Sequence, residues 1–276
     1  MTTSIIIPAH NEGAVIARCL LTLLKEATPG EFEIIVVANG CSDDTALKAR
    51  LAAPEATVIE LASASKSAAL NEGDRVARGF PRAYLDADIE ITTDAMRKLL
   101  AQLSGECLFV TPTPHFVTDR LSRPARAYYK IWQLLPWIQE GGGGGVFAMS
   151  EEGRQRFQAF PSDMNDDLFT KLQFQERERR LVSGADAAVR PPTSLRQIIR
   201  IRRRSYRHSA QVRELMELDR LHHHDTKRPY GLIFRTPRLW PAAMLYVLIY
   251  AISRVLGAIG SRKRRHVWER DQSSRT

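Results

Sequence analysis

The chain has 276 residues, 44% of them hydrophobic and 26% charged, with a formal net charge of +9. This composition excludes a globally disordered chain, and the 3 scattered cysteines exclude a disulfide scaffold and fit a reducing cytosol. The positive excess is uneven, because residues 196–276 alone carry about +13. The remainder is mildly acidic, and we predict no nucleic-acid partner.

Strand-like and helix-like segments alternate four times over the first 103 residues. Buried strands are predicted at residues 4–8, 32–38, 57–61 and 83–85, and helices at about 14–25, 45–51, 67–78 and 94–103. This alternation predicts an α/β fold with a mainly parallel sheet and helices on both faces. Ligands of such sheets bind at the carboxyl ends of the strands.

Two carboxylates, Asp86 and Asp88, follow the fourth predicted strand directly. In an extended segment, side chains two residues apart project to the same side, so both can face one ligand. Two carboxylates held that close repel each other unless a positive group lies between them. A hard divalent cation carrying a phosphorylated ligand is the natural candidate, with a solvated turn as the alternative.

Polar residues also follow the other predicted strands. Asn11 and Glu12 follow the first strand, residues 39–44 follow the second, and Lys66 lies at the start of the helix after the third. These segments meet at one edge of the predicted sheet. A nucleotide diphosphate with a metal would use this set of groups, and ordinary polar turns are the alternative.

Four segments, in this order, resemble the motif series of family 2 glycosyltransferases. They are IIIPAHNE at 5–12, VVANGCSDDT at 36–45, KSAALNEG at 66–73 and DAD at 86–88. The order and spacing of four motifs are more specific than any one of them. The resemblance implies the GT-A fold, a nucleotide diphosphate sugar as donor, inversion at the anomeric carbon, and Mg²⁺ or Mn²⁺ as cofactor.

The resemblance also implies roles for individual residues. Asp88 would ligate the metal that bridges the diphosphate, and Asp86 would lie nearer the ribose and assist the metal. The predicted donor-binding residues of this region are Pro8, Asn11, Glu12, Asn39, Lys66 and Asp86. The family often has two acidic residues after its second strand, where this chain has Ala38 and Asn39. The identity of the nucleotide, often uridine in the family, therefore stays open.

The middle of the chain combines an aromatic stripe with a glycine run. Residues 119–140 include Tyr128, Tyr129 and Trp132, which we predict to be core, with a hydrophobic acceptor groove as the alternative. Strands are predicted at 108–112 and 146–149. The five glycines at 141–145 are either a hinge or a close backbone approach to sugar or phosphate, and the resemblance favours the second.

An acidic pair and an arginine-rich helix follow. Asp166 and Asp167 resemble the family's acidic pair, whose second member is the general base, so we predict Asp167 as base with Asp166 as runner-up. The alternative is that both acids stabilise the start of a helix. In residues 195–213, the resemblance implies that Arg203 and Arg204 contact the diphosphate, with a solvated helix face as the alternative. Residues 222–225 (HHHD) are predicted to be a surface connector.

Residues 239–260 form the most apolar stretch and are about long enough to span a bilayer as a helix. Arg254 lies inside the stretch, and both flanks are basic. Basic residues on both sides fit a single pass poorly under the positive-inside rule. They fit better with a helix lying on, or dipping into, an anionic cytoplasmic leaflet.

We therefore predict a nucleotide-sugar-binding half at residues 1–105, an acceptor-binding and catalytic-base half of the same GT-A domain at 106–215, and a basic tail at 216–276. The predicted protein is an inverting, metal-dependent glycosyltransferase on the cytoplasmic face of the cell membrane. It would act in cell-envelope glycan or glycolipid synthesis on a lipid-linked or glycan acceptor. One alternative is a non-catalytic membrane-associated adaptor. The other, a sugar nucleotidyltransferase, would carry a Gly-rich phosphate loop that residues 9–13 lack.

Overall fold

The computed structural model describes residues 2–139, 142, 144–162, 165–215, 233 and 235–260. The chain divides into two compact units. Unit 1 comprises residues 1–116 and 141–189, and unit 2 comprises residues 117–140 and the chain from 190 onward. The helices at 123–132 and 195–215 pack against the C-terminal apolar helix. The functional division expected at residues 105 and 215 remains a prediction.

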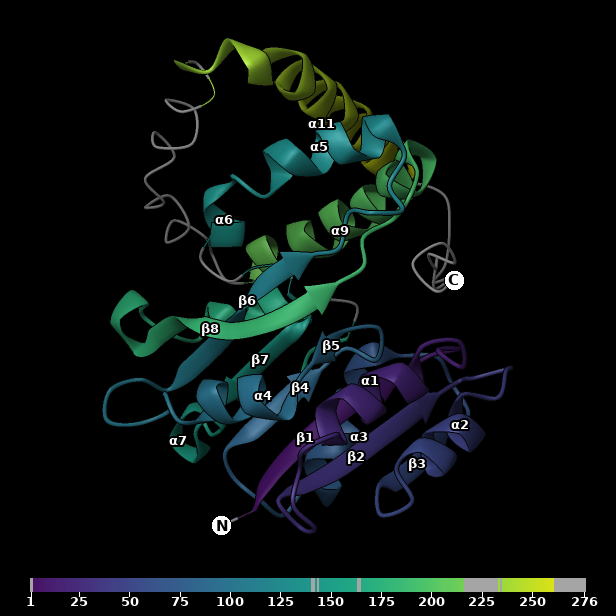
Figure 1. The fold of residues 1–276 in the computed structure, drawn as a ribbon, viewed down its shortest axis with the longest axis vertical. Helices are drawn as coiled ribbons and strands as arrows, with labels where there is room; N and C mark the ends of the chain where they lie inside the picture. The colour runs from purple at the N-terminus through teal and green to yellow at the C-terminus, as the bar shows by residue number, and fades with distance from the viewer. Residues whose placement is uncertain are drawn as a thin grey trace. The chain divides into compact units, whose positions relative to one another are not determined.

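The described part of unit 1 is built on an eight-stranded sheet of order β3-β2-β1-β4-β7-β6-β8-β5 (Figure 1). The strands are β1 Thr3–Ala9, β2 Phe32–Asn39, β3 Thr57–Leu61, β4 Arg82–Leu85, β5 Glu90–Ile91, β6 Phe109–Phe116, β7 Val146–Met149 and β8 Arg179–Val189. The pairs β2–β3, β1–β2, β1–β4 and β6–β8 are parallel, whereas β7 is antiparallel to β4 and β6, and β5 to β8. The mainly parallel α/β sheet is thus confirmed.

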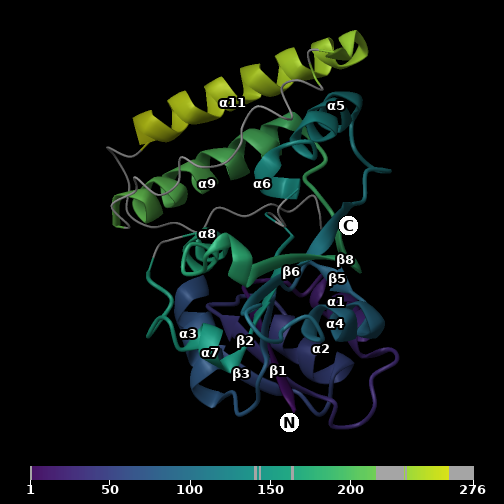
Figure 2. The ribbon, with the colours of Figure 1, turned by 90° about the vertical axis from the view of Figure 1, so that its left-hand side faces the viewer.

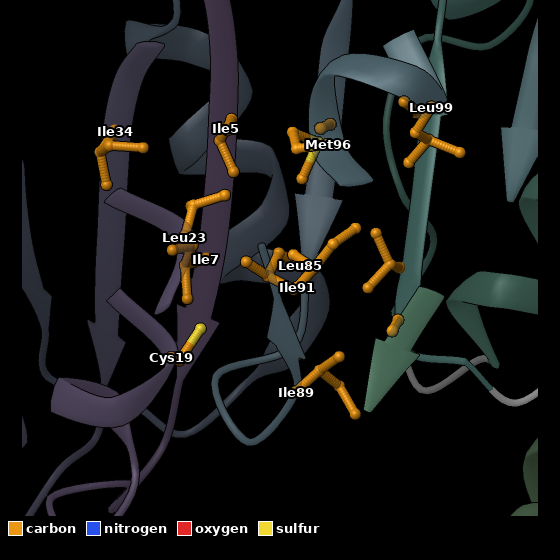
Figure 3. Close-up of a cluster of buried hydrophobic side chains, with 14 of the residues drawn as sticks. Ile5, Ile7, Cys19, Leu23, Ile34, Leu85, Ile89, Ile91, Met96 and Leu99 are labelled. Carbon is orange, nitrogen blue, oxygen red and sulfur yellow. The ribbon is translucent and has the colours of Figure 1, made fainter. Parts of the chain in front are cut away.

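Helices cover both faces of this sheet. They are α1 Ile16–Leu24, α2 Thr45–Ala52, α3 Lys66–Val76, α4 Thr93–Leu100, α7 Glu151–Arg154 and α8 Asp166–Lys171, with the 3-10 turn η1 Glu176–Glu178. Because side chains alternate along a strand, β1 sends Ile5 and Ile7 to one face and Ile6 to the other. Ile5 and Ile7 pack in a cluster with side chains of α1 and α4 (Figure 3), while Ile6 packs in a second cluster with Leu70 of α3.

A buried ion cluster ties α3, β4 and α7 together. Asp74 of α3 accepts hydrogen bonds from Arg82 Nη1 at 2.8 Å, from the Tyr84 hydroxyl at 2.7 Å and from Arg154 Nε at 2.9 Å. The Asp74 side chain is only 6% exposed, and its buried charge is compensated by two guanidinium groups and one hydroxyl. The cluster therefore fixes α3 relative to β4, the two elements from which the central site residues come.

Unit 2 is helical in its described part. Its elements are α5 Arg123–Trp132, α6 Pro136–Gln139, α9 Leu195–Leu215, the 3-10 turn η3 Pro237–Leu239 and α11 Trp240–Gly260. α11 packs along α9 and α5 (Figure 2). Tyr128, Tyr129 and Trp132 are buried at 2%, 4% and 5% exposure, and the Arg202 guanidinium lies 4.5 Å from the centre of the Trp132 ring. These aromatic residues are therefore core, as predicted.

The two faces of α11 differ in burial. Ala242, Ile249 and Ser253 are buried at spacings that place them on one side of the helix. The other side exposes large apolar residues: Trp240, Met244, Val247, Leu248 and Val255. Among the described residues, residues 237–257 form one helix that is long and apolar enough to cross a membrane, judged by length and composition alone. Arg254 is exposed, and its Nη1 donates to the Tyr250 hydroxyl at 3.0 Å.

Three features of the sequence-based account fall outside the described residues. They are the side chain of Arg204, the segment 222–225 and the basic residues 262–265. The expectations attached to them remain predictions.

Candidate active site

The carboxyl ends of three parallel strands define the site. β1, β2 and β4 end at Ala9, Asn39 and Leu85. Because these strands run in the same direction, the turns that follow them lie at one edge of the sheet. The turn after β4 carries Asp86 and Asp88.

Lys66 joins two of the predicted site carboxylates. Its Nζ lies 2.6 Å from Oδ1 of Asp86 and 2.9 Å from Oδ2 of Asp166. Lys66 is the first residue of α3, which Ser65 caps through its hydroxyl, and Asp166 is the first residue of α8, which Asn165 caps through its amide oxygen. Two helix starts and the turn after β4 thus meet at one ammonium group.

The electrostatics of this cluster are dominated by negative charge. Burial raises the pKa of Asp86 to about 6, with Asp166 and Asp88 adding to the rise and Lys66 opposing it. Burial and the neighbouring Asp166 raise the pKa of Asp167 to about 7. For Lys66, burial acts downward, but the carboxylates of Asp166 and Asp86 outweigh it and hold the pKa of the ammonium well above its usual value. One ammonium faces several carboxylates, so negative groups outnumber positive ones in this cluster.

The segment after β4 turns instead of remaining extended. The Ile89 N–H donates to the Asp86 carbonyl at 3.1 Å, which closes a turn. Burial nevertheless alternates, because Ala87 and Ile89 are 3% and 4% exposed whereas Asp86 and Asp88 are half-buried. The apolar neighbours therefore anchor the turn and leave both carboxylates accessible to a ligand.

The backbone of Gly145 lies against Asp86. Its carbonyl accepts the Asp86 N–H at 2.8 Å, and its φ of +62° is in the left-handed region. A Cβ added there would lie 3.0 Å from Oδ2 of Asp86 and 2.8 Å from Cγ1 of Ile89. The last residue of the glycine run thus makes a close backbone approach to a predicted site residue, while its approach to a sugar or phosphate remains a prediction.

We expect Gly145→Ala to lower both the melting temperature and donor affinity. A left-handed alanine costs about 1–2 kcal/mol, and the new methyl group would also displace Asp86. A loss of this size corresponds to a drop of about 2–8 °C in Tm for a domain of this size.

Gly144→Ala is the matched control for this prediction. A Cβ at Gly144 would have only Pro114 Cβ within reach, at 3.7 Å, which is ordinary van der Waals contact. Thermal unfolding and calorimetric nucleotide binding should be measured on both variants. Equal values for the two variants would contradict the role assigned to Gly145.

Asn11 joins the turn after β1 to the turn after β2. It has a φ of 51°, and its Oδ1 accepts the backbone N–H groups of Ser42 and Asp43 at 2.5 and 3.2 Å. Its Nδ2 donates to the Ser42 hydroxyl at 3.0 Å. The neighbouring Glu12 N–H donates to Thr45 Oγ1 at 2.8 Å. The polar groups of these residues thus hold two turns of the site edge together, and their contact with a donor remains a prediction.

Asn39 and Pro8 act within the fold. The Asn39 side chain is 1% exposed; its Nδ2 donates to the Ala9 carbonyl at 2.8 Å and its Oδ1 accepts the Ser65 N–H at 3.1 Å. Pro8 is buried in β1 opposite Val37. Both side chains are buried, and the contact of these two residues with a donor remains a prediction. Asn39 instead connects the ends of β1 and β2 to the start of α3, where Lys66 lies.

We expect Asn39→Asp to destabilise the protein by about 1–3 kcal/mol, the usual cost of leaving a buried polar group unsatisfied. A carboxylate oxygen would face the Ala9 carbonyl with no hydrogen to donate. Gln102→Glu is the control, because it adds the same charge beside Arg180, whose Nη1 already lies 2.8 Å from Oε1 of Gln102. Urea unfolding that gave equal stability for wild type and Asn39→Asp would contradict this role.

Asn71, which the sequence reasoning did not single out, holds the chain ahead of α8. Its Oδ1 accepts the Phe160 N–H at 2.8 Å, and its Nδ2 donates to the Phe160 carbonyl at 3.0 Å. Asn71 and Lys66 both lie on α3. This helix therefore bonds to the segment before α8 through Asn71, and to Asp166, the first residue of α8, through Lys66. Asn71 lies in the segment 66–73, the third of the four motif segments, and this position was the sequence signal that could have identified it.

The two arginines predicted to contact the diphosphate lie on α9 in unit 2. Arg203 is half-buried and packs near α11, where a Cβ added to Gly257 would lie 3.6 Å from its carbonyl oxygen. Contact of Arg203 and Arg204 with a donor remains a prediction.

The carboxylates of Asp86 and Asp88 suit a hard divalent cation. In the described ranges there is no group of three or more His, Cys, Asp or Glu side chains placed to hold a metal. Two carboxylates fit Mg²⁺ or Mn²⁺ even so, because such ions in nucleotide sites take their other ligands from phosphate and water. The Lys66 ammonium beside Asp86 also shows that this position accommodates positive charge.

Comparison with known proteins agrees with this geometry. The family model described as glycosyl transferase family 2 matches residues 4–152, from β1 into α7. The 4,4′-diaponeurosporenoate glycosyltransferases of Staphylococcus aureus strains MRSA252 and USA300 are each 27% identical over 193 residues, which cover 66% of this chain and 48% of theirs. The chain therefore spans about half the length of the curated relatives it matches.

Two solved structures are similar to this chain in fold. The mannosyltransferase PcManGT of Pyrobaculum calidifontis, in complex with GDP-Man and Mn²⁺, has a TM-score of 0.61 and 18% identity, covering 96% of this chain and 76% of its own. Glucosyl-3-phosphoglycerate synthase of Mycobacterium tuberculosis, in complex with phosphoglyceric acid, has a TM-score of 0.56 and 19% identity. The match covers 77% of this chain and 79% of the synthase chain.

These structures share the GT-A fold, which is therefore the fold of this protein. The chain belongs to glycosyl transferase family 2, a family of enzymes. The resemblance stated from the four sequence segments is confirmed, because the family model matches residues 4–152, which include all four.

Proposed function

We propose that this protein transfers a sugar from a nucleotide diphosphate sugar to an acceptor hydroxyl with inversion at the anomeric carbon. The observation that supports this most strongly is the cluster in which Lys66 joins Asp86 to Asp166, with Asp167 beside them. Such a cluster combines groups for a charged leaving diphosphate with a carboxylate that can accept a proton.

Asp167 is the proposed general base. Its neighbour Asp166 forms an ion pair with Lys66 at 2.9 Å, and a carboxylate neutralised in this way is a weaker proton acceptor. The pKa of Asp167, raised to about 7 by burial and by Asp166, is close to the value at which a base works best at neutral pH. Asp167 would take the proton of the acceptor hydroxyl as it attacks, on the side opposite the leaving diphosphate.

The donor end of the site belongs to Asp86, Asp88 and Lys66. Asp88 and Asp86 would hold Mg²⁺ or Mn²⁺, which when bound neutralises charge on the diphosphate. Lys66 already lies 2.6 Å from Asp86 and would bring its ammonium to the same phosphates. The Mn²⁺ and GDP-Man in the PcManGT complex support a divalent cation and a nucleotide sugar in this fold.

We expect kcat/KM to fall about tenfold for each pH unit below about 7. A base must be ionised to act, and a raised pKa means that Asp167 is protonated over this range. Asp86, whose pKa is about 6, would add a further fall at lower pH because its ionised form binds the cation. In Asp167→Asn the step near pH 7 should disappear from the pH profile, and its persistence would contradict the assignment.

Membrane association is the second part of the proposal. One side of α11 packs on α5 and α9, while the other exposes a continuous apolar strip from Trp240 to Val255. A helix already packed along one side is suited to lie in the plane of a membrane surface. The net positive charge of residues 196–276 complements an anionic cytoplasmic leaflet. We therefore assign the enzyme to the cytoplasmic face of the cell membrane, in synthesis of a cell-envelope glycolipid or glycan.

An apolar acceptor fits this location. The curated relatives are named for transfer to 4,4′-diaponeurosporenoate, whose ending denotes a carboxylate. A carboxylate acceptor is already ionised at neutral pH and needs no base, whereas a hydroxyl acceptor does. The size of the Asp167→Asn effect therefore distinguishes the two acceptor classes, and the raised pKa of Asp167 favours a hydroxyl.

The test is an incubation of the purified protein with UDP- and GDP-sugars and a lipid extract, with Mn²⁺ and with excess chelator. We expect a glycosylated product only with the metal, with an anomeric configuration opposite to that of the donor by NMR. A product with retained configuration would overturn the inverting mechanism, and undiminished transfer in chelator would overturn the metal assignment.

A further inference from the structure

An open pocket of about 440 Å³ lies between α9 and α11, wholly within unit 2. It is lined by Arg196, Ile199, Arg200 and Arg203 of α9 and by Leu256 of α11. The two helices run side by side in Figure 2, and α11 packs on α9 at the position of Gly257, next to Leu256. The pocket is therefore formed by the same packing that orients the exposed face of α11.

The pocket concentrates positive charge. Arg196, Arg200 and Arg203 are spaced four and three residues apart, so they share one face of the helix. Arg196 and Arg200 are exposed, and neither has a hydrogen bond or ion pair to another residue of the described ranges. Arg196 also lies in the first turn of α9, which has no acidic residue and where the helix dipole disfavours a cation. An anion bound there would reduce the repulsion between these like charges.

The pocket also has an apolar side. Ile199 and Leu256 complete its lining, and Leu256 is 41% exposed. Leu256 continues along one face of α11 to Ile252 and Leu248, four and eight residues earlier, which are 37% and 56% exposed. A ligand with a phosphate in the pocket could therefore continue as hydrocarbon along α11.

We infer that this pocket binds the phosphate headgroup of an anionic membrane phospholipid. Guanidinium groups bind phosphate oxygens in pairs of parallel hydrogen bonds, which distinguishes them from a diffuse basic surface. The inference rests on the membrane association proposed above and adds to it a specific lipid contact. It also gives Arg203 a place in a lipid site, an assignment separate from the predicted donor contact.

The test is flotation of the full-length protein with vesicles of phosphatidylcholine, with and without phosphatidylglycerol. The pocket variant is Arg196→Gln with Arg200→Gln, and both side chains are exposed, so the fold should be retained. The matched control is Arg235→Gln with Arg238→Gln, which removes the same charge. Both arginines are exposed residues of unit 2 that lie outside the pocket. A third variant, Arg196→Lys with Arg200→Lys, keeps the charge and removes the planar donor groups.

We expect the pocket variant to lose at least tenfold more affinity for phosphatidylglycerol vesicles than the control variant. The lysine variant should also lose several-fold, although its net charge is unchanged. Equal losses in the pocket and control variants, or full binding by the lysine variant, would contradict a specific headgroup site. The vesicles would then attract the protein only through its net positive charge.

Two further outcomes distinguish failure of the headgroup pocket from failure of the proposed membrane association. If the wild type bound phosphatidylcholine vesicles as well as those containing phosphatidylglycerol, membrane association would stand and the headgroup pocket would be wrong. If the wild type bound no vesicles, both would be wrong. Inorganic phosphate at millimolar concentration should not release the protein from vesicles, and release that depended on the two pocket arginines would identify the ligand as a soluble phosphate.

Discussion

Asp167→Asn is expected to lower kcat for a hydroxyl acceptor by about 10²–10⁴-fold, the usual contribution of a general base. Nucleotide affinity should be unchanged, because the carboxylate acts only when the acceptor loses its proton. The amide keeps the size of the side chain and cannot accept that proton. Single-turnover rates and calorimetric donor binding, measured on the same preparations, separate the two quantities.

Asp166→Asn is the comparison that tests this assignment. It removes the partner of Lys66 at 2.9 Å, and we expect it to disturb donor binding more than Asp167→Asn does. If Asp166→Asn instead gave the larger loss of kcat with donor affinity intact, the roles of the two acids would be reversed. A loss of kcat below about tenfold in Asp167→Asn would favour a carboxylate acceptor, which needs no base.

Asp88→Asn should abolish the metal-dependent part of nucleotide binding while the protein remains folded. An amide offers a single neutral oxygen where the cation needs a charged one, and the described site has only Asp86 as a second carboxylate on this turn. Asp86→Asn should have a milder effect, since its role is the indirect one.

Calorimetry with UDP and GDP, with and without Mn²⁺, measures this effect. Asp94→Asn is the control, because Asp94 is a 58% exposed carboxylate of α4 whose ion pair, among the described residues, is with Lys98 on its own helix. Unchanged metal-dependent binding in Asp88→Asn would remove Asp88 from the metal site.

Much of the fold follows from local patterns in the first 103 residues. Apolar runs bounded by polar turns predicted β1 to β4. Apolar spacing predicted the first helix and a polar cap the second, each to within a few residues of its observed bounds. These elements alternate regularly along the chain. The apolar segment 239–260 was likewise recognised because its composition alone distinguishes it.

The strands β5 and β8 were not predicted, for different reasons. β5 is only Glu90–Ile91, too short for any period to appear. β8 is long, but its burial is irregular and it contains Gly184 at a φ of +79°. It pairs with β6 through a register shift between Pro112 and Thr113. Such a strand is specified by its partner in the sheet, which a local pattern does not reveal.

The site shows the same division between local and distant information. The carboxylates of Asp86 and Asp88 were predictable because spacing and position after a strand carry the signal. The bridge from Lys66 to Asp166 joins helices far apart in sequence, so only the assembled fold brings it about. Asn39 was expected to face the donor because it follows β2, yet the backbone groups of Ala9 and Ser65 take up its amide.

The measurement that tests the central claim most directly is mass spectrometry of the product formed by wild type and Asp167→Asn from a panel of nucleotide sugars and a cellular lipid extract. A glycosyltransferase should give a lipid product heavier by one sugar residue with the wild type and far less of it with the variant. A non-catalytic adaptor on the same fold would give no such product with any donor, and that result, obtained with nucleotide binding intact, would contradict the proposed activity.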